Sequence, residues 1–287
     1  MNNLYLGIIA LLSYIFAVMD NYPPKIIWFL WLQGMDNAPL MVTKCYESWL
    51  GHNPGWQIIF LDESTVKGYF SGKYEQITKQ AFSDILRINL LAQYGGVWVD
   101  ATCFCTKPLD SWLPDYMQSG FFAFEKPGPD RMISSWFIAS AVNNHITNTF
   151  RQLVLDYWAK NKGMTLIENS KWKFLNKYLP RFGSQVWFEP LVTKGLKIHP
   201  YFWFHYLFEK NCLADNEVKQ LWSNTPKISA DIPHSLQFAG LFNPLTDEIK
   251  ADIDNKISPC YKLMWNYQPA DLKAGTVMDY LLNISTV

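Results

Sequence analysis

The chain has 287 residues, 49% of them hydrophobic, and its 25 basic residues balance 25 acidic ones. This length can bury the core of one large domain, or of one domain with appendages. A zero net charge argues against nucleic-acid binding, which depends on a basic surface. Aromatic residues make up 16% of the chain, and their rings suit either a large core or stacking on sugar and base faces.

The N-terminal segment Leu4–Met19 is an uncharged apolar run. It is shorter than the roughly 20 residues that span a bilayer. It also lacks the basic start and the cleavage site of a signal peptide, and the basic face of an interfacial helix. We interpret residues 1–22 as an apolar helix that either contacts the membrane or docks on the domain, and we expect a cytoplasmic protein at the inner face of the cell membrane.

Short apolar runs and amphipathic segments then alternate along the chain. Strands are expected at 25–31, 56–61, 97–100, 121–124 and 136–141, and helices at 38–50, 77–94 and 145–160. Such alternation predicts an α/β fold with a parallel sheet between two layers of helices. Residues 161–232 break into helical pieces and aromatic clusters, which predicts a helical subdomain.

The five cysteines indicate neither a disulfide framework nor a zinc site, because their number is odd and no pair has Cys-x-x-Cys spacing. Cys103 and Cys105 would point to the same side of a strand. We therefore expect buried free thiols, as is usual for a protein of a reducing cytosol.

The segment 81–102, AFSDILRINLLAQYGGVWVDAT, combines several chemical signals. Asp84 and Arg87 are three residues apart and share one face of the expected helix. A Gly-Gly pair would end that helix. The strand that follows would deliver Asp100 at its C-terminal end, the edge where open α/β sheets bind ligands. The segment predicts a site for a ligand with hydroxyls, phosphates and a divalent cation.

The pattern SD-x-LR-x-x-x-L-x-x-YGG-x-x-x-D in this segment resembles the signature of sugar-nucleotide glycosyltransferases that carry an Asp-x-Asp motif. These include yeast-type α-mannosyltransferases and the glucosyltransferase domain of large clostridial toxins. The pattern is most similar to that of bacterial capsular polysaccharide synthesis proteins. Further blocks in the same order extend the resemblance over residues 24–265: PKIIWFLWLQG, AP, SW, KPLDSWLP, SSWFIAS, PHSLQ and YKL.

The resemblance implies a GT-A-type, Rossmann-like nucleotide-sugar-binding sheet flanked by helices, with a helical insertion or C-terminal subdomain. Residues 23–265 would form the glycosyltransferase domain, with 161–232 shaping the acceptor site and 266–287 forming a C-terminal tail. The reaction implied is a retaining transfer to a capsular or surface glycan or a lipid-linked oligosaccharide. The expected donor is a UDP-sugar, with GDP-mannose as the alternative.

The resemblance also assigns roles to the central residues. Asp100 would hold Mn²⁺ or Mg²⁺, which stabilises the leaving diphosphate as a Lewis acid. The motif here reads Asp100-Ala101-Thr102, so its second acid is missing and direct metal binding is in doubt. Asp84 would accept hydrogen bonds from donor hydroxyls, and Arg87 would hold the sugar or a diphosphate oxygen. The alternative for this pair is a local helix salt bridge.

Flanking blocks supply further candidates by the same resemblance. Trp28, Trp31 and Gln33 fall where relatives bind the nucleoside. The two indoles would face opposite sides of a strand, so at most one is expected to touch the base. Trp136 falls where relatives place donor-sugar and acceptor contacts, as do its neighbours Ser135 and Phe137. Glu125 and Asp130, just before them, are acidic candidates near the reaction centre.

The late blocks contribute His234, Lys262 and Trp265. His234 would complete the metal site as a neutral imidazole, Lys262 would contact the diphosphate, and Trp265 would cover the donor as a lid. A structural histidine and a surface lysine are the alternatives. For the whole chain, two other functions stay open: a nucleotide-sugar hydrolase or phosphotransferase, and a degenerate sugar-binding scaffold of a polysaccharide assembly complex.

Overall fold

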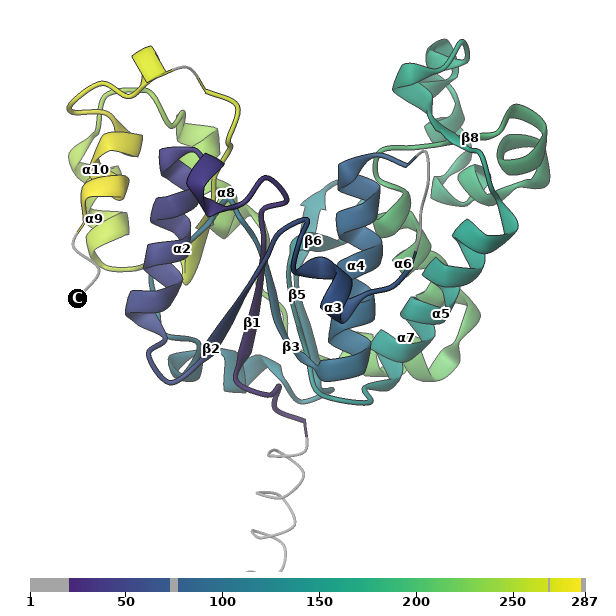
Figure 1. Cartoon of the computed structure of the whole chain (residues 1–287), viewed down its shortest axis with the longest axis horizontal. Coiled ribbons are helices and arrows are strands. Elements are labelled where there is room, and N and C mark those ends of the chain that lie inside the picture. Colours follow the sequence, from purple (N-terminus) through teal and green to yellow (C-terminus); the bar gives the residue numbers. More distant parts are fainter. Residues whose placement is uncertain (1–20, 73–76, 268, 285–287) are drawn as a thin grey trace, which may run out of the picture.

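The computed structural model describes residues 21–72, 77–267 and 269–284. A central sheet separates two groups of helices, with α2, α8, α9 and α10 on one side and α3 to α7 on the other (Figure 1). The predicted α/β fold with helices on both faces is therefore confirmed. The apolar run Leu4–Met19 lies outside the described residues, so its predicted membrane contact stays a prediction. Within the described residues, no helix combines the length and the apolar character needed to cross a bilayer.

The sheet has five strands in the order β2-β1-β3-β6-β5. Their bounds are Ile26–Leu30 for β1, Gln57–Leu61 for β2, Gly96–Asp100 for β3, Phe121–Gly128 for β5 and Arg131–Ser140 for β6. β1 pairs in parallel with β2 and β3, whereas β6 runs antiparallel to both β3 and β5. The prediction of a parallel sheet was thus wrong for one strand. Only two residues connect β5 to β6, and such a short connection can join only antiparallel neighbours.

The three expected helices lie close to their predicted positions: α2 spans Leu40–His52, α4 Lys79–Tyr94 and α5 His145–Lys160. The short helix α3 (Val66–Tyr69) was not predicted. α4 begins at Thr78, whose side chain accepts from the backbone N–H of Ala81, and it ends at Gly95 with φ of 65°. Gly96 also has a positive φ, of 96°, and a Cβ there would lie 2.6 Å from the carbonyl oxygen of Ile26. The Gly-Gly pair therefore permits the tight passage from α4 into β3.

Successive side chains along each strand pack into two separate cores, one on each face of the sheet, because side chains alternate between the two faces of a strand. Ile27 and Phe29 of β1 pack with α2 and the C-terminal helices. Trp28 of β1 and Trp98 of β3 pack on the other face with α4, α5 and α6. All five cysteines are free and buried, as predicted.

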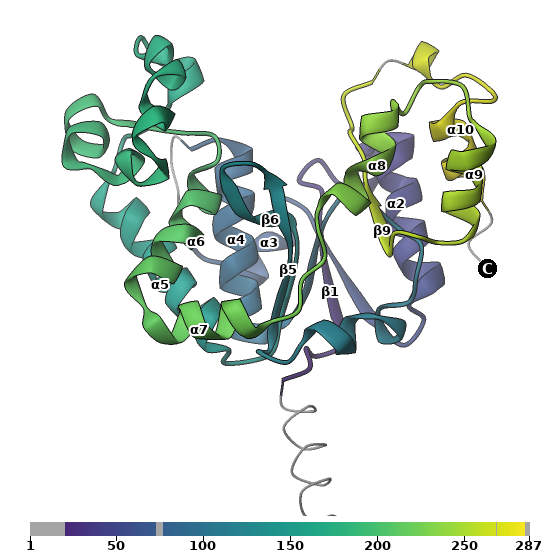
Figure 2. The ribbon, with the colours of Figure 1, turned by 180° about the vertical axis from the view of Figure 1, so that it is seen from behind.

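The region 161–232 divides into two parts. α6 (Trp203–Ala214) and α7 (Asn216–Asn224) belong to the helical layer on the sheet. The preceding residues form a small lobe around Trp187 and Ile198, in which β7 (Thr165–Leu166) pairs with β8 (Ile198–His199). This lobe projects beyond the sheet in both views (Figure 2).

The last part of the chain returns to the first core. It comprises α8 (Asp231–Ala239), α9 (Asp247–Asp254), β9 (Cys260–Lys262) and α10 (Val277–Asn283). β9 pairs with β4 (Cys103–Cys105), the short strand after β3. Val277, Met278 and Leu281 of α10 are fully buried, so the segment interpreted as a tail contributes a packed helix instead. Short turns of 3₁₀ or π type lie at Met35–Asn37, Leu109–Ser111, Leu113–Tyr116, Ile167–Asn169, Lys173–Lys177, Leu179–Phe182, Ser184–Phe188, Leu191–Leu196 and Pro269–Asp271.

Candidate functional site

A cavity of about 550 Å³ opens where β1 and β3 end. Its lining comes from the residues after these strands, from the first turns of α4 and from three later parts of the chain. The lining residues are Leu30, Trp31, Leu32, Gln33, Lys79, Gln80, Ser83, Asp84, Arg87, Trp98, Asp100, Ala101, Thr102, Ser135, Tyr201, His205, Lys262 and Trp265. The carboxyl ends of parallel strands are the usual ligand edge of such sheets.

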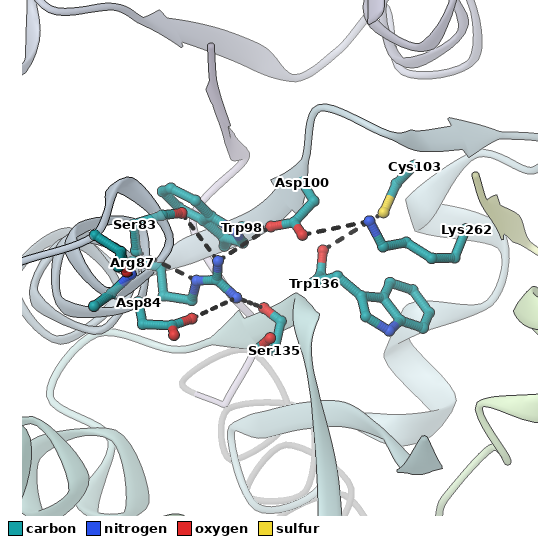
Figure 3. A network of polar contacts seen from close by, with 11 residues as sticks. Ser83, Asp84, Arg87, Trp98, Asp100, Cys103, Ser135, Trp136 and Lys262 are labelled. Carbon is teal, nitrogen blue, oxygen red and sulfur yellow. Dashed lines mark hydrogen bonds and ion pairs between the residues drawn. The ribbon is translucent and has the colours of Figure 1, made fainter. Parts of the chain in front are cut away.

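Arg87 is the centre of the polar network in this cavity (Figure 3). Its guanidinium lies 3.2 Å from a carboxylate oxygen of Asp84 and 3.2 Å from one of Asp100. It also donates to the hydroxyl of Ser83, at 3.0 Å, and to the backbone carbonyl of Ser135. The side chain is only 4% exposed. Arg87 thus joins α4 to the end of β3 and to the middle of β6, which is more than the local helix salt bridge considered above.

Aromatic rings hold this arginine in place. The guanidinium carbon lies 5.0 Å from the centroid of the Trp98 ring and 5.7 Å from that of Phe204, within the range of cation–π attraction. The indole N–H of Trp98 donates to Asp100 at 3.0 Å. The planar guanidinium and the carboxylate are therefore fixed relative to each other before any ligand binds.

The two carboxyl groups that share Arg87 titrate differently. Burial raises the pKa of Asp84 to about 7, a shift that Arg87 opposes and the charge of Asp100 reinforces. Burial would also raise the pKa of Asp100, but the charges of Arg87 and Lys262 outweigh it and lower this pKa below its usual value. At neutral pH Asp100 is ionised, whereas Asp84 is close to its midpoint.

Lys262 reaches the cavity from β9. Its ammonium donates to the hydroxyl of Thr102 and lies 3.5 Å from the second carboxylate oxygen of Asp100. The other oxygen of Asp100 is the one that Arg87 and Trp98 contact. The carboxylate is therefore held from both sides by hydrogen-bond donors, two of them cationic.

Trp31, Gln33 and Trp265 line a further part of the cavity. The rings of Trp31 and Trp265 meet edge to face with centroids 6.2 Å apart. Trp265 is 55% exposed, so its free face is open to a planar ligand. This arrangement can accept a base beside the charged network.

Three of the predicted site residues do not line the cavity. Trp28 is fully buried further from the C-terminal end of β1, on the same face as the lining residues Leu30 and Trp98. Its indole N–H donates to the carbonyl of Gly95 at 2.9 Å. Trp136 stacks on Phe124 at 5.0 Å, and the edge of the His234 ring meets it at 5.4 Å. Strand alternation turns Trp136 to the face opposite its neighbour Ser135, which lines the cavity. The ring of His234 packs against Trp136 and therefore lies outside the cavity as well.

The secondary candidates beside Trp136 also differ in position. Ser135 contributes its backbone carbonyl to the cavity, whereas Phe137 is fully buried in the core. Glu125 pairs through its backbone with Ser229, and Asp130 accepts from the hydroxyl of Tyr206; neither lines the cavity.

Tyr201 and His205 are lining residues that the sequence analysis did not propose for the site. Both belong to the run YFWFHYLF, which was interpreted only as an aromatic cluster. Burial lowers the pKa of His205 to about 3, reinforced by the charges of Arg131 and Arg87, so this imidazole is neutral. The polar groups of Tyr201 and His205 within this aromatic run were the sequence signal that could have indicated a site.

The residues around Asp100 do not fit a divalent cation. Among the described residues, no three His, Cys, Asp or Glu side chains gather where they could hold a metal. Mn²⁺ and Mg²⁺ prefer several oxygen ligands, but both oxygens of Asp100 and the hydroxyl of Thr102 already accept from cationic or N–H donors. His234, the expected third ligand, does not line the cavity.

Comparison with known proteins identifies the family. Residues 17–167 and 191–281, most of the chain, match the family described as Capsular polysaccharide synthesis protein. The chain therefore belongs to this family, as the resemblance in the central segment predicted.

Curated relatives cover shorter stretches. The O-glycosyltransferase braB of Annulohypoxylon truncatum is 24% identical over 199 residues, which are 61% of this chain and 46% of that protein. The initiation-specific alpha-1,6-mannosyltransferase of Saccharomyces cerevisiae is 28% identical over 116 residues, 35% of this chain and 24% of that protein. The chain thus spans less than half the length of these relatives. A solved PaToxG glycosyltransferase aligns over 84% of this chain and 91% of that chain at 17% identity. The TM-score of this alignment is only 0.37.

Proposed function

We propose that this chain is a glycosyltransferase that moves a sugar from a nucleotide-diphospho-sugar to a glycan. The observation that carries this proposal is the pair of cations, Arg87 and Lys262, that converge on Asp100 at the ligand edge of the sheet. A guanidinium and an ammonium together suit the oxyanions of a diphosphate. The names of the relatives, all glycosyltransferases, support the same class of reaction.

The remaining lining residues suggest how the donor lies. Trp31, Gln33 and Trp265 would bind the nucleoside, with a UDP-sugar as the expected donor, and the diphosphate would meet Lys262. The sugar would then lie near Asp84, whose carboxylate can accept hydrogen bonds from hydroxyls. Tyr201, on the side of the projecting lobe, would face the acceptor.

In the transfer, the bond between the anomeric carbon and the diphosphate oxygen breaks, and the acceptor hydroxyl oxygen bonds to that carbon. The acceptor proton passes to the departing diphosphate, and the negative charge on the leaving oxygen is stabilised by the two cations. Asp84 and Asp100 are the only carboxylates among the described lining residues, and Arg87 engages both. Neither carboxylate is a free nucleophile, so the proposed retaining transfer is written without a covalent enzyme intermediate.

The family description supports a capsular or surface polysaccharide, or its lipid-linked precursor, as the acceptor. Such precursors are assembled at membranes. The uncharged run Leu4–Met19 supports a place at the inner face of the cell membrane.

The test is a panel of UDP- and GDP-sugars with glycan acceptors, with released nucleotide and glycosylated product measured by mass spectrometry. We expect product from one donor, and its loss in Asp100→Ala at an unchanged melting temperature. Nucleotide release that ignores every acceptor would indicate a hydrolase instead. Donor binding without turnover would indicate a sugar-binding scaffold.

A further inference from the structure

We infer that the ammonium of Lys262 takes the position that a divalent cation holds in Asp-x-Asp enzymes, so that this site binds its nucleoside diphosphate without a metal. The inference rests on the proposed function and specifies how the leaving diphosphate is neutralised. It replaces the expected Mn²⁺ or Mg²⁺ with a side chain of this chain.

The first argument is the position of the ammonium. The Asp-x-Asp motif would offer a metal the side chains of Asp100 and Thr102. The Nζ atom of Lys262 donates to the carboxylate of Asp100 (Figure 3). It also donates to the hydroxyl of Thr102. A metal bound to the same two oxygens would have to displace the ammonium or lie against it, and two cations at such a distance repel each other.

The second argument is that the backbone fixes this position. β9 pairs antiparallel with β4, with Lys262 opposite Cys103. The N–H of Leu263 donates to the carbonyl of Thr102 at 2.7 Å, which extends the pairing by one step. Tyr261 and Leu263 on either side are buried, and the Lys262 side chain is only 17% exposed. The ammonium is therefore placed by the core rather than by a mobile surface chain.

The third argument is that the uncharged side chain of Thr102 suits the single positive charge of Lys262. A second carboxylate at position 102 would add a negative charge that a divalent cation balances better than one ammonium. The hydroxyl of Thr102 accepts an N–H and needs no counter-charge. With Arg87 and Lys262 cationic and Asp100 ionised, the cluster keeps an excess of positive charge whenever Asp84 is protonated. The departure from the motif thus leaves an anion site rather than a damaged metal site.

The experiment is calorimetric titration of UDP, with GDP in parallel, into the full chain in a buffer with EDTA and in one with Mn²⁺. We expect the same Kd in both buffers within about twofold. Lys262→Met should weaken binding at least tenfold in both. Lys227→Met is the matched control, because Lys227 is also partly buried but donates to backbone carbonyls away from the cavity.

A converted site provides an independent check. The double variant Thr102→Asp with Lys262→Ala restores both acids of the motif and removes the ammonium. We expect it to bind the nucleotide only when Mn²⁺ is present, whereas the wild type is insensitive to the metal.

The outcomes separate the inference from the proposed function. Nucleotide binding by the wild type that requires Mn²⁺, or full binding by Lys262→Met, would overturn the inference and leave a nucleotide-sugar enzyme. Binding of neither nucleotide in either buffer would contradict the proposed function itself. The comparison of the two buffers uses the wild-type chain and therefore does not depend on the folding of any variant.

Discussion

The ring of Trp265, which follows β9, meets the ring of Trp31, which follows β1, edge to face. Together the two rings form one side of the cavity. In the proposed complex, the exposed face of Trp265 stacks on the base. Stacking of a base on an aromatic ring contributes about 1–3 kcal/mol.

Trp265→Ala should therefore raise the Kd for the nucleotide about tenfold, which corresponds to about 1.4 kcal/mol. Calorimetric titration measures this change. Phe182→Ala is the control, because Phe182 is 77% exposed and does not line the cavity. Equal affinities for both variants would remove Trp265 from the donor site.

Arg87→Lys should reduce donor turnover by about tenfold to a thousandfold, or about 1.4–4 kcal/mol. The reason is geometric: Arg87 contacts Asp84, Asp100 and the carbonyl of Ser135 at once, and a lysine lacks the planar fork for this. Steady-state kinetics with the donor that the nucleotide-sugar panel identifies measures the loss.

The matched control for that substitution is Arg151→Lys. Arg151 also bonds a polar side chain, that of Asn89, at 2.8 Å, but it lies outside the cavity. Its kinetics should equal those of the wild type. Wild-type kinetics in Arg87→Lys would mean that the arginine serves the fold alone.

Asp84 should make stability depend on pH. Burial raises its folded-state pKa to about 7, so between roughly pH 4 and 7 the folded chain keeps a proton that the unfolded chain releases. Its contribution to stability is present below about pH 4 and is lost as the pH rises to about 7. Asp84→Asn removes this term, so its melting temperature should rise relative to the wild type across that window. A constant difference between the two melting curves from pH 4 to 8 would contradict the raised pKa.

Trp28→Phe should change stability and not nucleotide binding. The variant loses the buried hydrogen bond to the carbonyl of Gly95, leaves that carbonyl unsatisfied and opens space, at a cost of about 1–3 kcal/mol. Thermal unfolding should show the loss, while the Kd for UDP stays that of the wild type. A weakened Kd at full stability would restore Trp28 as a nucleoside contact.

Deletion of residues 1–20 should release the protein from membranes and leave transfer to a soluble acceptor intact. The expectation follows from the uncharged run Leu4–Met19. Fractionation of cells that express either form measures it. A full-length protein that is recovered without membranes, together with an aggregated truncation, would indicate docking on the domain.

The parts of the site that are local in sequence could be predicted. The spacing of Asp84 and Arg87 on a helix, the Gly-Gly stop and the strand that ends at Asp100 each depend on neighbours a few residues away. The alternation along β1 also predicted that Trp28 and Trp31 would face opposite sides of the sheet, and the two rings pack with different cores. The structure keeps all of these relationships.

The parts of the site that depend on contacts between distant segments of the chain could not be predicted from the sequence. Nothing near Lys262 indicates that β9 pairs with β4 and brings this lysine to Thr102. The turn at Pro129 and Asp130 makes β5 and β6 a hairpin, but the apolar runs alone fit a parallel sheet equally well. His205 lines the cavity because α6 packs against the sheet, which its own aromatic segment does not reveal.

The pairing of β9 with β4 also determines when the site can work during synthesis. α4 and β3 leave the ribosome before β9, and α4 can form from residues close in sequence. The cation that completes the cluster lies 160 residues beyond Thr102 in the sequence, and contacts between such distant segments form slowly. A nascent chain that stops before β9 therefore has Asp100 and Thr102 without Lys262, and we expect it to lack the proposed nucleotide site.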